Sequence, residues 1–164
     1  MDSESPTQRM LIGSRAEYLA AADALYGMAQ HALCIFDPDL EMLGLNSAER
    51  IERLQHFLQR GQENLLRIAL HDPSNILRAY PRLVELMRRF APRVPVFRTE
   101  GVAARAQDCF VLADARHFVR RAVAQQARGV HALHEDGEGR LLHERFEEIW
   151  AASAEAVSPS TLGL

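Results

Sequence analysis

The stretch Gln107-Asp-Cys-Phe-Val-Leu-Ala-Asp-Ala-Arg-His-Phe-Val-Arg-Arg121 decides the fold of this chain of 164 residues. Cys109–Ala113 is a short apolar run, and a second apolar run begins at His117. Asp114 and Ala115 stand between the two runs, where aspartate favours a tight turn because its side chain bonds nearby backbone amides. Two such runs around a tight corner predict two adjacent antiparallel strands.

Helical and strand patterns alternate in the chain before this hairpin. Ser14 begins a first helix, with Glu17 three residues later as in a capping box. Asn46 and Ser47 open a second helix, which we expect to end at Gly61 as a left-handed C-cap. A third helical pattern contains Pro81, which predicts a kink or a break there. Short apolar runs predict strands at His31–Phe36, Leu65–Leu70 and Val94–Thr99.

After the hairpin the pattern predicts one more strand and a last helix. The strand is Gly129–His134, and Asp136–Gly139 reads as a turn before a helix at Arg140–Ser153. We expect Phe146 and Trp150 to be largely buried on that helix, because large aromatic side chains dominate such cores.

The whole order predicts an α/β fold with a single mixed β-sheet and helices on both faces. We expect a disordered leader at residues 1–10, one domain at residues 11–156 and a flexible tail at residues 157–164.

Composition narrows the function classes. A formal charge of −3 predicts neither a nucleic-acid partner nor an anionic membrane. All 19 basic residues are arginine, so Schiff-base chemistry and a lysine general base are excluded. Cys34 and Cys109 lie in apolar runs, which predicts buried free thiols. With no signal pattern and no apolar run of roughly 18 residues, we expect a cytoplasmic protein without a membrane partner.

The hairpin resembles the phospholipase D signature, in which a His, a Lys two residues on and an Asp seven residues on share one strand and its turn. Gln107 stands at the His position, Cys109 at the Lys position, and Asp114 matches the Asp. The element order also resembles one half of a phospholipase D-like fold. It is most similar to bacterial phospholipase D-like domains without the catalytic pair, which have no assigned activity and are sometimes attached to an N-acetyltransferase domain. The segments that carry this resemblance are Arg82–Leu86, Val111–Asp114 and Phe146–Trp150.

This resemblance implies the absence of phosphodiesterase activity by the phospholipase route. That route forms a covalent intermediate on a histidine, and the amide of Gln107 is not basic. The complete enzymes also join two signature halves at one site, and this chain carries one.

Polar residues that follow the predicted strands form a candidate cleft, because ligands of open α/β sheets bind outside the carboxyl ends of the strands. Its residues are His71, Asp72, Arg98, Gln107, Asp114 and Arg116. Arginine binds anions bidentately and histidine transfers protons near neutral pH. The alternative is local structure: Asp37 and Asp72 each precede a proline and suit turns, and Arg98 and Arg120 could hold Asp72 or Asp114 in ion pairs.

Three functions fit these residues. The favoured hypothesis is a non-catalytic binding or regulatory module for a small anionic ligand or an unknown protein partner, with a homodimer as a possible assembly. The second is a small hydrolase or transferase with His71 as general base beside carboxylates. The third is nucleic-acid binding through an arginine strip on the third helix and the hairpin, which nearby glutamates would neutralise.

Neither a metal nor a cofactor is predicted. His131 and His134 are three residues apart, and residues at that spacing on a strand point to opposite faces. The sequence contains no His-Glu-x-x-His motif, no Cys-x-x-Cys pair and no Gly-rich phosphate loop.

Overall fold

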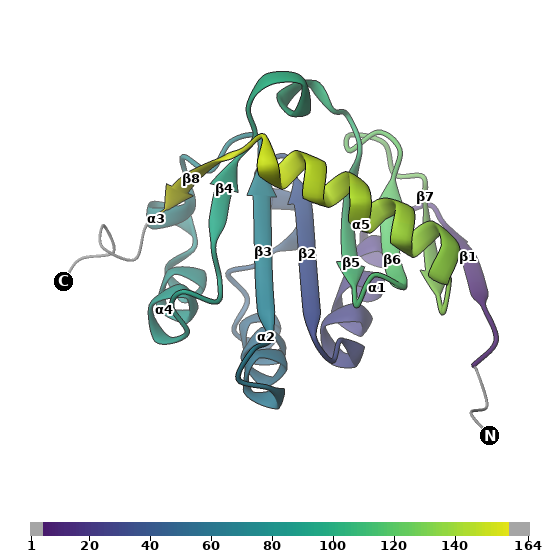
Figure 1. Ribbon diagram of the computed structural model, residues 1–164, viewed down its shortest axis with the longest axis horizontal. Coiled ribbons are helices and arrows are strands. Elements are labelled where there is room, and N and C mark those ends of the chain that lie inside the picture. Colours follow the sequence, from purple (N-terminus) through teal and green to yellow (C-terminus); the bar gives the residue numbers. More distant parts are fainter. Residues whose placement is uncertain (1–4, 158–164) are drawn as a thin grey trace.

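The computed structural model describes residues 5–157 and contains one eight-stranded mixed sheet with the order β1-β7-β6-β5-β2-β3-β4-β8 (Figure 1). The strands are β1 (Gln8–Ile12), β2 (Ala32–Asp37), β3 (Leu65–Leu70), β4 (Val96–Arg98), β5 (Cys109–Ala113), β6 (His117–Arg121), β7 (Gly129–Leu133) and β8 (Ala154–Val157). The α-helices are α1 (Arg15–Met28), α2 (Ala48–Arg60), α3 (Ile76–Ala79), α4 (Pro81–Arg89) and α5 (Asp136–Ala151), and two 3-10 turns are η1 (Glu41–Leu43) and η2 (Gly101–Arg105).

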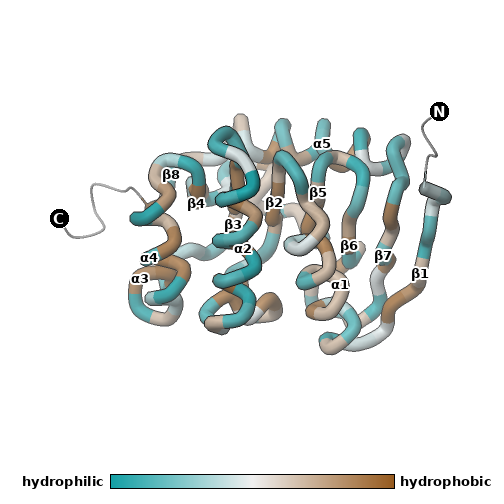
Figure 2. Tube along the Cα trace, turned by 90° about the horizontal axis from the view of Figure 1, so that it is seen from below, coloured by the Kyte–Doolittle hydropathy of each residue, from teal (hydrophilic) through white to brown (hydrophobic). Residues whose placement is uncertain are grey.

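Helices cover both faces of the sheet, as the sequence predicts. The helices α1, α2 and α4 lie on one face, and α5 crosses the other face diagonally (Figures 1 and 2). Each face has its own apolar core. Tyr18 and Leu25 of α1 belong to the first core, and Phe146 of α5 packs with Phe110 and Phe118 in the second.

The direction of the strands decides which loops share an edge of the sheet. The strands β2, β3 and β4 are parallel, whereas β5 runs antiparallel to β2, with Phe36 opposite Phe110 and Leu33 opposite Ala113. The start of β5 therefore lies beside the carboxyl end of β2. The β5–β6 corner, residues 114–116, lies at the opposite edge of the sheet.

Two of the predicted helix boundaries are confirmed. The amide of Glu17 donates to Ser14 Oγ over 3.1 Å, and Glu17 Oε1 accepts from the Gly13 amide, so the cap of α1 forms. The break at Pro81 separates α3 from α4, with Pro81 in the first turn of α4, where a missing amide hydrogen costs nothing.

The predicted left-handed cap at Gly61 is wrong. Its backbone is extended, with φ −157° and ψ 139°. Side chains satisfy the last carbonyls of α2 instead: Asn64 Nδ2 donates to Phe57 O, and Arg93 Nη1 donates to Leu58 O and Gly61 O. A Cβ at Gly61 would lie 2.7 Å from Asn64 Oδ1, so any other residue here would force the Asn64 side chain to shift.

The two edge strands differ from the prediction. Gln8–Ile12 pairs with β7, although residues 8–10 were expected in a disordered leader. Ala154–Val157 pairs with β4, although Val157 was expected in the flexible tail. Neither segment has the alternation or β-branched content of a strand, and pairing partners far away in sequence supply the order. Residues 1–4 and 158–164 of the predicted leader and tail lie outside the described residues.

The last helix begins earlier than predicted, at Asp136, so the expected turn Asp136–Gly139 is the first turn of α5. Its amide hydrogen bonds explain the difference. The Gly139 amide donates to Glu135 O over 2.8 Å, and the Glu135 amide donates to Arg116 O over 2.9 Å. Phe146 is fully buried as predicted, whereas Trp150 is half-buried and stacks on Phe97 at 4.0 Å between ring centroids.

Candidate functional site

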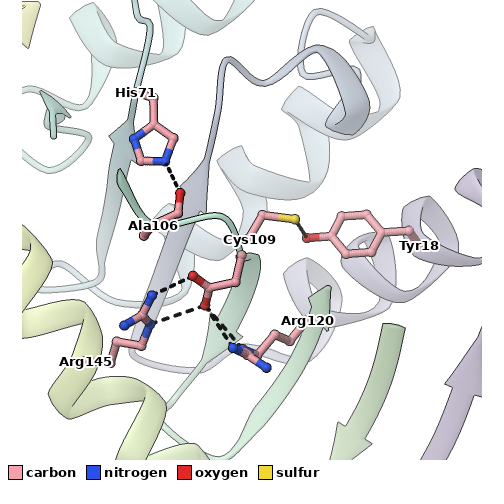
Figure 3. Close-up of polar contacts among 7 residues, drawn as sticks. Tyr18, His71, Ala106, Cys109, Arg120 and Arg145 are labelled. Carbon is pink, nitrogen blue, oxygen red and sulfur yellow. Dashed lines mark hydrogen bonds and ion pairs between the residues drawn. The ribbon is translucent and has the colours of Figure 1, made fainter. Parts of the chain in front are cut away.

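The segment Ala106–Cys109 leads into β5 and is the centre of the polar contacts at the carboxyl edge of the parallel strands (Figure 3). We call it the β5 entry. Successive side chains of a strand point to opposite faces. Cys109 accordingly contacts α1, and Asp108 contacts α5. The β5 entry therefore joins the two sides of the sheet at the edge where a ligand is expected.

His71, at the end of β3, uses both ring nitrogens within the fold. Its Nε2 lies 2.9 Å from Ala106 O, which can only accept, so Nε2 carries a hydrogen (Figure 3). In the neutral ring Nδ1 then accepts from Thr99 Oγ1 at 2.6 Å. The ring also packs edge-on against Phe36 at 5.3 Å. Because neither nitrogen is left for a substrate and neither contacts a carboxylate, this arrangement does not favour the hydrolase hypothesis.

Asp108 is buried and forms ion pairs with two arginines on the α5 side of the β5 entry. Arg145 binds it bidentately, with Nη2 to Oδ1 at 2.5 Å and Nε to Oδ2 at 3.2 Å. Arg120 donates to Oδ2 from Nε at 3.3 Å and from Nη2 at 3.2 Å. Two positive charges on one carboxylate leave a positive excess at this point. The pairing differs from the predicted one, in which Arg120 would hold Asp72 or Asp114.

On the other side of the β5 entry, Cys109 is buried against α1. Its Sγ lies 3.5 Å from the hydroxyl of Tyr18, and burial raises the pKa of the thiol to about 11. Arg121, directly opposite Cys109 on β6, is only 1% exposed, and its guanidinium lies 4.5 Å from the centroid of the Tyr18 ring. Its Nε and Nη2 have no hydrogen-bond partner among the described residues. Because the Cys109 thiol is buried and its pKa is raised, it is not activated as a nucleophile.

Asp37 is the last residue of β2 and lies close enough to Arg121 to interact with its charge. The pKa of Asp37 is raised. Its Oδ2 accepts from the amides of Leu40 at 2.8 Å and Asp39 at 3.2 Å, which makes the predicted turn. Burial raises the pKa of Asp37 from 3.8 to about 6, and these amides and Arg121 counter only part of that rise. A pocket of about 300 Å³ beside it is lined by Asp37, Asp39 and Glu41. These carboxylates repel an anion.

The raised pKa of Asp37 predicts a pH dependence of stability. Since the folded protein holds the proton more tightly than the unfolded chain, this group stabilises the fold below about pH 4, and that stabilisation is lost as pH rises to about 6. The slope reaches up to about 1.4 kcal/mol per pH unit in that window. Urea unfolding from pH 4 to pH 7 should show that Asp37→Asn reduces this slope. An unchanged slope in the variant would show that another group is responsible.

Two of the predicted cleft residues, Asp114 and Arg116, lie at the opposite edge of the sheet. Asp114 accepts three backbone amides, from Gln30 at 2.8 Å, His31 at 2.8 Å and Ala32 at 3.0 Å. Arg116 Nε donates to Asp136 Oδ1 at 2.9 Å. These two residues therefore do not join His71, because β5 runs antiparallel and carries its far end away from the carboxyl edge.

The other predicted residues lie near the carboxyl edge, and among them Asp72 serves local structure. Asp72 is exposed, and its Oδ1 accepts from the Ser74 amide at 3.0 Å. Hydrogen bonds from Ser74, and to a smaller extent the charge of Arg98, hold the pKa of Asp72 below its usual value. Gln107 and Arg98 are exposed, and the carbonyl of Gln107 accepts from the Ala124 amide at 2.7 Å. The turn interpretation therefore describes Asp72 correctly.

Sequence reasoning missed a pocket on the α5 side of the β5 entry. It has a volume of about 490 Å³ between η2 and α5, and its lining is Val102, Ala103, Arg105, Ala106, Arg145, Glu148, Ile149 and Ala152. Arg105 is exposed and has no hydrogen bond or ion pair among the contacts of residues 5–157. We call this cavity the Arg105 pocket. Its parts come from a loop and from a helix some 40 residues later, so no local motif signals it.

The arginines proposed as a nucleic-acid strip do not share a face. Those of α4 make local contacts: Arg82 Nη1 donates to Asn46 O, and Arg89 Nη1 donates to Gln55 Oε1. On β6, Arg120 pairs with Asp108, and Arg121 is buried on the side of the first core. The arrangement therefore does not favour this hypothesis.

Histidines in the described part of the chain form no metal centre. Within residues 5–157, no group of three or more His, Cys, Asp or Glu side chains is placed to hold an ion. His117 Nδ1 accepts from the His134 amide at 2.9 Å, and burial lowers the pKa of His117.

Among the described helices none is long and apolar enough to cross a membrane.

The fold recurs in solved structures of low sequence identity. Nuc from Salmonella typhimurium, a phospholipase D family member, superposes with a TM-score of 0.64 at 11% identity, covering 93% of this chain and 100% of that one. NucT from Helicobacter pylori gives 0.62 at 9%, covering 92% and 100%. TrmBL2, an archaeal chromatin protein, gives 0.64 at 11% over 95% of this chain, which spans 57% of TrmBL2. These likenesses show a shared fold.

Sequence comparison gives a narrower result. Among curated protein sequences none matches this chain significantly. One family model does match, across residues 14–159, which is most of the chain. That span runs from the N-cap of α1 to beyond β8 and so contains both apolar cores and the β5 entry. The chain therefore belongs to the family described as Domain of unknown function (DUF7931).

Proposed function

We propose that this domain is a non-catalytic binding module with a degenerate phospholipase D-like site, and that it takes the anionic group of a small ligand in the Arg105 pocket. The observation that carries the proposal is the pocket itself. Its volume of about 490 Å³ lies within the range of roughly 300–1,000 Å³ of small-molecule sites. It opens beside the β5 entry, at the carboxyl edge where ligands of α/β sheets bind.

The lining of the Arg105 pocket suits a ligand with one anionic group and an apolar body. Arg105 provides a guanidinium without a carboxylate partner among the described residues, and Arg145 shares Asp108 with Arg120. Ala103, Ala106 and Ile149 supply the apolar wall. Glu148 also lines the pocket, and its negative charge disfavours a ligand with more than one anionic group.

Three features support a binding role without catalysis. Gln107, at the position of the nucleophile in the phospholipase D signature, carries an amide, which cannot form a covalent phospho-intermediate by nucleophilic attack. Cys109 is buried with a thiol pKa of about 11. His71 is held by Thr99 and Ala106 on both ring nitrogens. A general base needs a free lone pair within reach of its substrate.

Titration with phenyl phosphate tests this proposal. We expect binding that Arg105→Ala weakens about tenfold, because one charge-assisted contact contributes roughly 1–3 kcal/mol. The control is Arg53→Ala, an exposed arginine of α2 on the opposite face, which removes the same charge and should leave the affinity unchanged. Equal losses in the two variants would indicate attraction by net charge only and would contradict a site.

The non-catalytic part of the proposal has its own measurement. Incubation with bis(4-nitrophenyl) phosphate should release no nitrophenolate above the uncatalysed background. A robust release that Gln107→Ala abolishes would overturn it, and phenyl phosphate binding could still stand. The two results are therefore separable.

A further inference from the structure

A second cavity lies on the α5 face, over β6, β7 and β1. It has a volume of about 220 Å³ and is lined by Arg9, Leu11, Phe118, Arg120, Ala122, Val123, Gln126, Arg128, Gly129, Val130 and Glu138. We call it the Arg128 pocket. Leu11 pairs with Val130, which pairs with Arg120, so the three side chains stand in one row on the same face of β1, β7 and β6.

The walls of this pocket come from parts of the chain that meet only in the fold. Figure 1 shows the first turn of α5 beside β6, β7 and β1, and that turn contributes Glu138. The loop between β6 and β7 contributes Val123, Gln126 and Arg128. Buried Phe118 and half-buried Val130 belong to the floor. The result is a small apolar hollow with charged residues in its lining.

The charges of the Arg128 pocket are not balanced. Glu138 is engaged by Arg9, with Nη1 to Oε2 at 2.5 Å. Arg120 shares Asp108 with Arg145. Arg128 is exposed and has no ion pair or hydrogen bond among those of the described residues. The pocket therefore has a positive excess, and an arginine fork suits a carboxylate because it can donate two parallel hydrogen bonds.

Apolar surface is also left open here. Leu11 is 80% exposed although it sits on a strand beside the hollow. Single exposed leucines are common, but this one adjoins Val123 and Val130 in the lining of a concave site. An apolar ligand body in the hollow would cover Leu11 while its charged end reaches Arg128.

We propose that the Arg128 pocket binds a compact carboxylate with an aromatic or branched apolar body. The volume of about 220 Å³ is below the usual range for drug-sized ligands, so the occupant is small. The positive excess selects an anion, and the apolar floor selects against inorganic ions. This site is distinct from the Arg105 pocket and does not depend on the function proposed there.

Sodium benzoate is the probe, with the full chain at pH 7 and binding followed by chemical-shift changes of ¹⁵N-labelled amides. We expect shifts centred on Gly129 and Val130, and an affinity at least tenfold higher than that of neutral benzamide. Arg128→Ala should weaken benzoate binding about tenfold, and Leu11→Gln should weaken it severalfold. Both residues are exposed, so neither variant threatens the fold. Arg53→Ala is again the matched control and should have no effect.

Each other outcome overturns the inference. Absence of benzoate binding, or equal binding of benzamide, removes the carboxylate requirement. Inorganic phosphate that binds as tightly as benzoate removes the apolar requirement. Loss of benzoate binding in Arg105→Ala but not in Arg128→Ala assigns the ligand to the Arg105 pocket. That result leaves the proposed function intact and contradicts a second site at the Arg128 pocket.

Discussion

Replacement of Asp114 by alanine is expected to lower the free energy of unfolding by about 4 kcal/mol. The Asp114 carboxylate accepts the amides of Gln30, His31 and Ala32, which join α1 to β2. Only the Ala32 contact is part-buried, and an amide that water cannot reach costs roughly 1–3 kcal/mol when it loses its acceptor, whereas the exposed amides of Gln30 and His31 lose roughly 0.5–1.5 kcal/mol each. The residue also has φ +55°, and a left-handed backbone costs alanine roughly 1–2 kcal/mol. Urea unfolding at pH 7 measures the change.

Two further variants separate these contributions at Asp114. Asp114→Asn keeps one acceptor oxygen and tolerates the left-handed backbone, so we expect an intermediate loss. Asp72→Ala removes an exposed carboxylate whose hydrogen bonds come from the neighbouring Ser74, and its cost should be small. If Asp114→Ala costs no more than Asp72→Ala, the three amides do not depend on Asp114.

Replacement of Gly139 by alanine is the second large effect, with an expected loss of about 3 kcal/mol. A Cβ at Gly139 would lie 2.3 Å from Ala115 O and 2.7 Å from Arg116 Cα. Both are backbone atoms of the β5–β6 corner, which cannot rotate away as a side chain could. The first turn of α5 must therefore move off the sheet, and urea unfolding should report the loss.

Gly137 is the matched control in the same turn of α5. Nothing lies within 4 Å of a Cβ built at Gly137, and its backbone is not left-handed. Gly137→Ala should therefore stabilise the protein by roughly 0.5–1 kcal/mol, because alanine loses less backbone entropy in a helix. If Gly137→Ala and Gly139→Ala destabilise the protein equally, contact with the β5–β6 corner is not the reason that α5 fails to tolerate alanine.

Local sequence determined the class of the fold and much of its hairpin. Cys109–Ala113 and Leu65–Leu70 are strands with the predicted bounds, and the Ser14 cap and the break at Pro81 are present. These features depend on residues close together in sequence: an apolar run, a turn former, a capping side chain or a missing amide hydrogen. Of the candidate site, sequence alone indicated the edge at His71 and Gln107 and the turn at Asp72.

Tertiary structure alone decided which of those side chains meet. The amides that Asp114 accepts lie 82 to 84 residues earlier in the chain, and the ring of His71 is held by Thr99 and Ala106, 28 and 35 residues later. Pairing between distant strands sets these distances, and the antiparallel direction of β5 sends the two ends of one short segment to opposite edges of the sheet. Side-chain periodicity reports which face a residue occupies and carries no information about the direction of its neighbour strand. Both arginine pockets depend on that direction, so only the folded chain could reveal them.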